Sequence, residues 1–232
     1  MSGLIYAILW LFFNVFSRVF LRYRTTGQEH IPRKGGVLFA ANHASYSDIP
    51  LLGCGIPRRV AYLGRATLFP KRFFNWALRS LGWIPLKTDR IDRKAFGEAI
   101  SLIKAGKPVV IFPEGTRSQD GHLKKGKPGI GVIVAETQCQ VIPAYISGSY
   151  EVLPMGATRL RLHPVTIHFG EPLEFSSSPG ERSRDFYDYV SATVMRRIAE
   201  LGQVPYPYNH KQESLKSASQ PSNAEGEAGN FC

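Results

Sequence analysis

Short apolar runs alternate with longer amphipathic stretches along most of the chain. Continuous apolar runs of about four to eight residues are typical of buried strands, whereas apolar positions three or four apart are typical of helices. We therefore expect an α/β layer fold, in which a central sheet is flanked by helices. The expected strands are residues 36–41, 59–63, 83–86, 108–112, 141–146 and 165–169, and the expected helices are residues 73–81, 95–105, 129–137 and 183–201, with a further helix beginning near residue 49.

The first 24 residues form a distinct N-terminal segment. Its apolar run extends from Leu4 to Phe20, and polar residues interrupt the run from Asn14 onward. The unbroken part is about ten residues long, which is short of the roughly 20 that cross a bilayer. Three arginines then follow with no acidic residue among them (Arg18, Arg22 and Arg24). We expect a helix that lies in or dips into the membrane, with its basic end at the cytoplasmic headgroups. A buried core helix is the alternative.

The remainder of the chain divides at residue 208. Residues 25–208 are long enough to bury a core of their own and form one expected catalytic domain. Residues 209–232 are mostly Ser, Gln, Asn, Glu and Gly. This composition is typical of a disordered tail, because it offers too little apolar surface to offset the entropy lost on ordering.

The net charge is +11 over 232 residues, which indicates an anionic partner. Nucleic acid, an anionic membrane surface and a phosphorylated substrate all qualify. Residues 58–94 interleave basic and aromatic side chains. Such a mixture suits a membrane interface or RNA, although a solvated basic face is the simplest alternative. The three cysteines form no C-x-x-C pair, so we expect reduced thiols and no zinc site.

A candidate general base follows the first expected strand of the domain. His43 lies just beyond residues 36–41, and Asp48 comes five residues later. Ligands of α/β proteins bind at the carboxyl ends of strands. An aspartate can accept a hydrogen bond from one imidazole nitrogen and leave the other nitrogen to take a proton. No nucleophile accompanies the pair, so the substrate could bring its own hydroxyl. The alternative is a helix cap beside a satisfied buried histidine.

A candidate anion site follows the strand expected at residues 108–112. Gly115 would let backbone N–H groups approach a ligand, Thr116 adds a hydroxyl, and the Arg117 guanidinium matches phosphate bidentately. Glu114 would repel phosphate, so we expect it to hold an arginine or to accept a hydrogen bond from a substrate hydroxyl. An ordinary surface turn with a salt bridge is the alternative.

Further cations could join this anion site. Arg65 lies at the end of the second expected strand, and three lysines follow the candidate anion site (Lys124, Lys125 and Lys127). The chain lacks G-x-S-x-G, a P-loop and the dinucleotide glycine pattern. Nucleophilic serine hydrolysis, nucleotide hydrolysis and NAD chemistry therefore lack their usual sequence devices.

Taken together, these motifs resemble those of the lysophospholipid acyltransferase family, the 1-acyl-sn-glycerol-3-phosphate acyltransferases. The resemblance covers roughly residues 25–175 and rests on four motifs in the family's order. They are Asn42-His43-x4-Asp48, Gly64-Arg65-Ala66-Thr67-Leu68-Phe69, Phe112-Pro113-Glu114-Gly115-Thr116-Arg117-Ser118 and Val141-Ile142-Pro143-Ala144. In the second motif the family often has Glu where this chain has Thr67.

The resemblance implies the glycerolipid acyltransferase fold with a central mixed sheet. It also implies transfer of a fatty acyl group from acyl-CoA or acyl carrier protein to the sn-2 hydroxyl of 1-acyl-sn-glycerol 3-phosphate, which forms phosphatidic acid. His43 would be the base and Asp48 its orienting partner. The phosphate side of the acceptor would be held by Arg65, Glu114, Gly115, Thr116 and Arg117. No metal or cofactor is implied, and the expected location is the cytoplasmic face of the inner membrane.

Four competing interpretations remain open. The acceptor could be another lysolipid, or water could replace it, which would make the protein an acyl hydrolase. The chain could instead be a non-catalytic binder of anionic lipids, although such a binder needs neither His43 nor Asp48. Nucleic-acid binding rests on charge alone, and the apolar N-terminal segment counts against it. The expected partners are thus a thioester donor, a lysophospholipid and an anionic membrane surface, with no nucleic acid.

Overall fold

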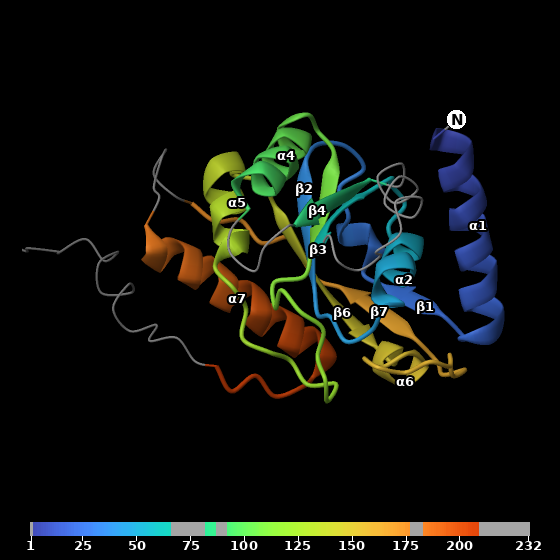
Figure 1. Ribbon diagram of the computed structural model, residues 1–232. Helices are drawn as coiled ribbons and strands as arrows, with labels where there is room; N and C mark the ends of the chain where they lie inside the picture. Colours follow the sequence, from blue (N-terminus) through green and yellow to red (C-terminus); the bar gives the residue numbers. More distant parts are fainter. Residues whose placement is uncertain (1, 66–81, 87–91, 177–182, 209–232) are drawn as a thin grey trace, which may run out of the picture.

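The computed structural model describes residues 2–65, 82–86, 92–176 and 183–208. This part of the chain forms a sheet with helices on both of its faces (Figure 1). The helix expected at residues 73–81, residues 66–69 of the second motif and the tail at residues 209–232 lie outside the described residues.

The sheet has seven strands in the order β1-β7-β6-β2-β5-β3-β4. All neighbouring strands are parallel except β6 and β7, which are antiparallel, so the expected central mixed sheet is confirmed. The strands are β1 (Arg24–Thr26), β2 (Val37–Ala41), β3 (Ala61–Arg65), β4 (Trp83–Leu86), β5 (Pro108–Ile111), β6 (Val141–Ser147) and β7 (Thr166–Phe169). Strand β1 was not predicted from the sequence, because this three-residue edge strand carries no apolar run.

Two of the helices, α4 and α7, begin at a capping side chain. The Asp92 carboxylate accepts hydrogen bonds from the first backbone amides of α4, and the Ser183 hydroxyl caps α7 in the same way. The helices are α1 (Ser2–Phe20), α2 (Asp48–Gly55), α4 (Arg93–Lys104), α5 (Gly129–Thr137), α6 (Ser149–Val152) and α7 (Arg184–Gly202), with a 3-10 turn at Gln28–His30.

The two faces of the sheet carry separate apolar cores. Helices α4, α5 and α7 contribute to one core, and α2 with the inner side of α1 contributes to the other. Side chains of β2 alternate between them: Leu38 and Ala40 lie in the first core, and Phe39 lies in the second. Burial on both faces explains why β2 is a continuous apolar run.

The strand order places one position of the chain at a topological switch point. From β2 the chain passes through α2 to β3, on the side of the sheet where β5 lies. From β5 it returns to β6, which lies on the other side of β2, so the connections of the neighbouring strands β2 and β5 run in opposite directions. Open α/β sheets bind ligands outside the carboxyl ends of strands at such a point. His43 follows β2 there, and the turn at residues 113–118 follows the neighbouring strand β5.

Candidate active site

His43 and Asp48 form a hydrogen-bonded pair at the carboxyl end of β2. The Nδ1 atom of His43 lies 2.8 Å from Oδ2 of Asp48. The same oxygen accepts the backbone N–H groups of Ala44 and Ser45, each at 2.8 Å, and Asp48 is fully buried as the first residue of α2. A carboxylate that accepts from Nδ1 assigns the proton to that nitrogen, which leaves a lone pair on Nε2.

The turn at residues 113–118 holds the backbone of His43 on both sides. The His43 N–H donates to Oε1 of Glu114 at 3.0 Å, and the N–H of Ser118 donates to the His43 carbonyl at 2.7 Å. The Phe112 ring stacks on the imidazole, with 4.1 Å between centroids. The two motifs are 71 residues apart between His43 and Glu114. They form one site because β2 and β5 are paired parallel strands.

Glu114 is a buried link rather than an open carboxylate. Its side chain accepts the N–H of His43 through one oxygen and the N–H of Lys124 through the other, at 3.0 and 3.1 Å. Burial raises its pKa to about 7; the two backbone hydrogen bonds oppose this rise, and the nearby charge of Asp48 adds to it. Both oxygens of Glu114 therefore accept hydrogen bonds from backbone N–H groups. From the sequence we had expected an arginine or a substrate hydroxyl as the partner.

Arg117 packs on an aromatic residue of the histidine loop. Its guanidinium carbon lies 3.4 Å from the centroid of the Tyr46 ring, a cation–π contact that fixes the orientation of the planar group. The carbonyl of Arg117 accepts a hydrogen bond from Nζ of Lys124 at 2.9 Å. Sequence reasoning did not single out Tyr46, although it lies inside the Asn42–Asp48 stretch.

Gly115 adopts the left-handed conformation, with φ of 69°. Its N–H closes the turn on the carbonyl of Phe112 at 2.9 Å, so this amide is not the one that meets a ligand. A Cβ at Gly115 would lie 2.9 Å from Cδ of Lys127, and the Lys127 amide donates to Pro113 at 2.8 Å. The structure therefore brings the Lys127 side chain against Gly115 and the Lys124 ammonium against the Arg117 carbonyl, and both Lys125 and Lys127 are exposed.

The remaining predicted residues lie at the same edge of the sheet. Arg65 is the last residue of β3, whose neighbour is β5, and the structure describes its backbone only. Thr116 is half-buried between Gly115 and Arg117. Among the described residues, no group of three or more metal-ligating side chains could hold a metal ion.

Two side chains outside the predicted set anchor the histidine loop. The Asn42 amide pairs with both backbone groups of Ile146 in β6, at 2.7 and 3.0 Å. The hydroxyl of Ser45 donates to the carbonyl of Leu153, just after α6, at 2.8 Å. The loop that carries His43 is thus fixed to β6 and to the chain beyond α6. Rigid support of this kind keeps a catalytic base in its reactive orientation.

These features define an α/β protein whose buried His–Asp pair lies beside a cationic turn, at the switch point of a mixed sheet. Residues 22–147, more than half of the chain, match the model of the Acyltransferase family. The chain belongs to that family.

Named relatives point the same way. The chain is 29% identical over 163 residues to a chloroplastic 1-acyl-sn-glycerol-3-phosphate acyltransferase of Arabidopsis thaliana, a match that covers 68% of this chain and 44% of the relative. It is 27% identical over 177 residues to the 1-acyl-sn-glycerol-3-phosphate acyltransferase of Bacillus subtilis, covering 75% and 85% of the two chains. The chain spans about half the length of the plant relatives, 44% for the Arabidopsis protein and 54% for one from Cocos nucifera.

A solved structure is also similar. The crystal structure of the 1-acyl-sn-glycerophosphate (LPA) acyltransferase PlsC from Thermotoga maritima superimposes with a TM-score of 0.69 at 28% sequence identity. The match covers 88% of this chain and 83% of the PlsC chain. The expected glycerolipid acyltransferase fold and the expected family are thereby confirmed.

Proposed function

We propose that the protein transfers a fatty acyl group from a thioester donor, acyl-CoA or acyl carrier protein, to the sn-2 hydroxyl of 1-acyl-sn-glycerol 3-phosphate. The observation that carries the proposal is the bond from His43 Nδ1 to the buried Asp48 carboxylate, which leaves Nε2 as a base beside the Arg117 turn. The relatives support this acceptor, because they are named as acyltransferases of 1-acyl-sn-glycerol 3-phosphate.

In this mechanism His43 is a general base and then a general acid. Nε2 takes the proton of the sn-2 hydroxyl as its oxygen attacks the thioester carbonyl, and Asp48 stabilises the imidazolium that forms. The tetrahedral intermediate collapses, the carbon–sulfur bond breaks and the departing thiolate recovers the proton from Nε2. The substrate supplies the nucleophile, so no covalent acyl-enzyme forms.

The acceptor phosphate would bind at the turn that holds His43. Arg117 offers a planar fork that the Tyr46 ring already orients, and Lys127 lies over the same turn. The backbone amides of Thr116 and Arg117 are the ones we assign to the phosphate, because the amide of Gly115 closes the turn. Arg65 would approach from the end of β3. Glu114 would contribute by fixing the turn to His43.

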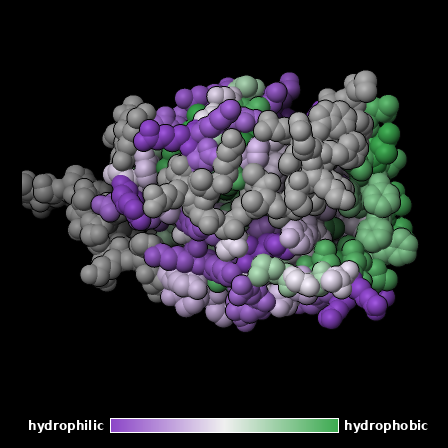
Figure 2. Space-filling view, in the orientation of Figure 1, coloured by the Kyte–Doolittle hydropathy of each residue, from purple (hydrophilic) through white to green (hydrophobic). Residues whose placement is uncertain are grey.

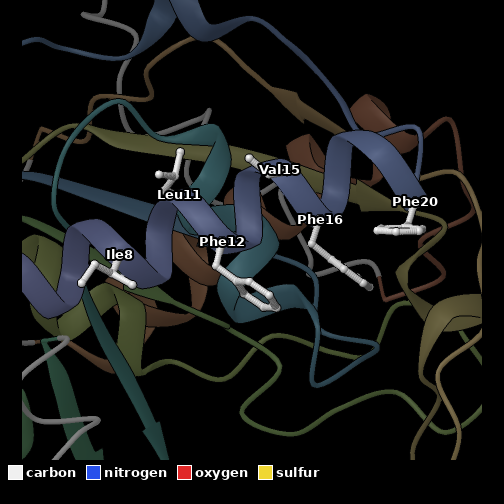
Figure 3. Close-up of a pocket in the computed structure, with 6 residues that line it drawn as sticks. All are labelled: Ile8, Leu11, Phe12, Val15, Phe16 and Phe20. Atoms are coloured by element: carbon white, nitrogen blue, oxygen red, sulfur yellow. The ribbon is translucent and has the colours of Figure 1, made fainter.

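We further propose that helix α1 rests on a membrane surface. Its polar residues Asn14 and Ser17 are buried against the protein beside the partly buried Phe13 and Phe16, whereas most of its large apolar residues are exposed. Figure 2 shows this apolar surface along one edge of the molecule, and Figure 3 shows Ile8, Phe12 and Phe20 among the residues that line a groove on α1. Within the described residues, no helix combines the length and apolarity needed to cross a bilayer.

An acyl-transfer assay with labelled donors tests the proposed function. Purified protein is given labelled acyl-CoA or acyl carrier protein, together with lysophosphatidic acid or lysolipids with other headgroups, and wild type is compared with His43→Ala. We expect phosphatidic acid from wild type, and a loss of at least about 10³-fold in the variant, because the base is removed. Near-normal turnover by His43→Ala would refute the mechanism, and release of free fatty acid without transfer would indicate a hydrolase.

A further inference from the structure

A second exposed apolar and basic surface lies far from α1 in the sequence. Residues 155–163, here called the 155–163 loop, run from the end of the α6 region towards β7. Within this loop Leu160 is 47% exposed and Leu162 is 65% exposed. The neighbouring side chains Arg159, Arg161 and His163 are also exposed, and the loop contains no acidic residue.

The loop begins beside the catalytic residues. The Ser45 hydroxyl donates to the carbonyl of Leu153, and Ser45 forms an isolated β-bridge with Pro154. Ser45 also donates its backbone N–H to Asp48. The chain that enters the 155–163 loop is therefore two hydrogen bonds away from the carboxylate that orients His43.

The loop ends at the base of α1. The N–H of Val165 donates to the carbonyl of Leu21 at 3.0 Å, and Leu21 directly follows the last residue of α1. At that end of α1, Val19 is 65% exposed and Phe20 is 51% exposed. Figure 1 shows the segment beyond α6 at the same end of the molecule as the carboxyl end of α1. The 155–163 loop therefore ends close to the exposed carboxyl end of α1.

The chemistry of the loop fits one kind of partner. Leucines that alternate with arginines place apolar groups at the depth of the acyl chains and guanidinium groups at the phosphates, as interfacial segments do. A soluble acidic protein would satisfy the arginines but would leave both leucines without an equivalent partner. The positive net charge of the chain favours the same anionic surface.

We propose that the 155–163 loop is a second membrane-contacting segment, which seats on anionic lipid together with α1 and holds the catalytic loop at the bilayer surface. A lysophospholipid would then reach His43 from the membrane without crossing water. This inference deepens the proposed function and rests on it only for the identity of the lipid substrate, because membrane contact is measured separately from catalysis.

The test measures binding of the full-length chain to sedimentable vesicles of phosphatidylcholine, with and without phosphatidylglycerol. One variant combines Leu160→Ser with Leu162→Ser, and a second combines Arg159→Gln with Arg161→Gln. The control combines Arg184→Gln with Arg197→Gln, since α7 covers the opposite face of the sheet from α1 and both arginines are exposed. Thermal unfolding of each variant checks that its fold is unchanged.

We expect the leucine variant to bind both kinds of vesicle roughly tenfold more weakly, because apolar contact does not depend on lipid charge. The arginine variant should bind the phosphatidylglycerol vesicles roughly tenfold to thirtyfold more weakly and the neutral vesicles less than about twofold more weakly. The control should match wild type within about twofold. Wild-type binding by the leucine variant would overturn the proposal.

Acyl transfer is then measured on two forms of the acceptor. Towards a short-chain, monomerically soluble lysophosphatidic acid, both loop variants should keep wild-type turnover, whereas towards acceptor in vesicles their turnover should fall in parallel with binding. If the arginine variant binds vesicles normally but loses transfer from acyl carrier protein alone, the loop docks the donor protein and the membrane proposal is wrong. If loop-dependent vesicle binding is present while wild type transfers no acyl group, the proposed function fails and the membrane contact stands.

Discussion

Replacement of Asp48 by asparagine separates the charge of the proposed catalytic pair, His43 and Asp48, from its geometry. In the structure Oδ2 accepts three hydrogen bonds, whereas Oδ1 is buried without a hydrogen-bond partner. An asparagine can place its carbonyl oxygen where Oδ2 lies and keep all three N–H donors. Its NH2 group then occupies the unpartnered position of Oδ1. The substitution therefore leaves the imidazole tautomer in place and removes the negative charge that stabilises the imidazolium.

The size of the expected loss in kcat follows from the distance between the His43 and Asp48 side chains and from the burial of Asp48. Nδ1 of His43 lies 2.8 Å from Oδ2 of Asp48, and Asp48 is fully buried. Two unit charges about 4 Å apart interact by about 4 kcal/mol at an effective dielectric constant of about 20. The hydrogen bond that the neutral imidazole already makes to the carboxylate in the ground state offsets part of that gain, so we expect a net loss of roughly 3 to 4 kcal/mol in the transition state. This loss corresponds to a decrease of about 10²- to 10³-fold in kcat.

Steady-state kinetics with lysophosphatidic acid tests this reasoning. We expect kcat to fall while the acceptor KM stays within about twofold, because Asp48 stabilises charge that appears only during reaction. The NH2 group left without an acceptor should lower the free energy of unfolding by about 1 to 2 kcal/mol. Asp120→Asn is the matched control: Asp120 is exposed near the same turn, and its variant should stay within about twofold of wild type. An Asp48→Asn enzyme that keeps more than about a tenth of wild-type kcat would refute the electrostatic role.

Two further substitutions test the turn. Arg117→Ala should raise the acceptor KM about tenfold to a hundredfold and leave the donor KM unchanged, because a charge-assisted bidentate contact with the phosphate is lost. Arg117→Lys should recover part of this loss. An unchanged acceptor KM in Arg117→Ala would show that Arg117 is not part of the phosphate site. The pKa of Glu114 rises from 4.5 to about 7 on folding, so ionised Glu114 destabilises the native state above its unfolded pKa. Relative to Glu114→Gln, the free energy of unfolding of wild type should therefore fall as pH rises from about 5 to 7.5, by at most about 3 kcal/mol, and parallel urea-denaturation profiles of the two proteins would contradict this.

Sequence patterns located the elements whose side chains are buried on both faces. The run at residues 108–112 predicted β5 within one residue, because a parallel strand between two cores must be apolar throughout. The strand β1 and the helix α6, of three and four residues, left no periodic signal. The backbone groups of β1 are satisfied by a strand distant in the sequence, as in the pairing of Arg24 with Thr166. No local pattern encodes such contacts.

In the candidate site, too, some residues could be predicted from the sequence and others could not. Residue types and spacing identified His43, Asp48 and Arg117, because their chemistry is visible in the side chains themselves. The role of Glu114 was not visible, because its partners are backbone amides that only the pairing of β2 with β5 brings into reach. Tyr46 escaped for a similar reason, since the ring acquires its role only when Arg117 lies on it.

The polar residues of the N-terminal segment lie on the side of α1 that faces the protein. In the sequence Asn14 interrupts an apolar run, but in the structure it and Ser17 lie buried on the inward face of α1, beside Phe13 and Phe16. The Asn14 NH2 group donates to the carbonyl of Trp10, and the Ser17 hydroxyl donates to that of Asn14, whereas Oδ1 of Asn14 is buried without a hydrogen-bond partner. An apolar helix with a small polar stripe can therefore pack against the protein through its polar side.

The N-terminal segment also holds the helix that begins at Asp48. The Tyr23 hydroxyl donates to the carbonyl of Leu51 at 2.8 Å, and the indole of Trp10 donates to that of Gly53 at 3.3 Å. The carbonyl of Gly53 is one of the last four of α2, which a helix leaves without internal partners, whereas the bond to Leu51 ties the middle of α2 to the N-terminal segment. Deletion of the segment would therefore remove support from α2 as well as the outward apolar surface. Substitutions confined to the outward face of α1 are the proper test of its membrane contact, because they leave the hydrogen bonds to α2 and the position of Asp48 intact.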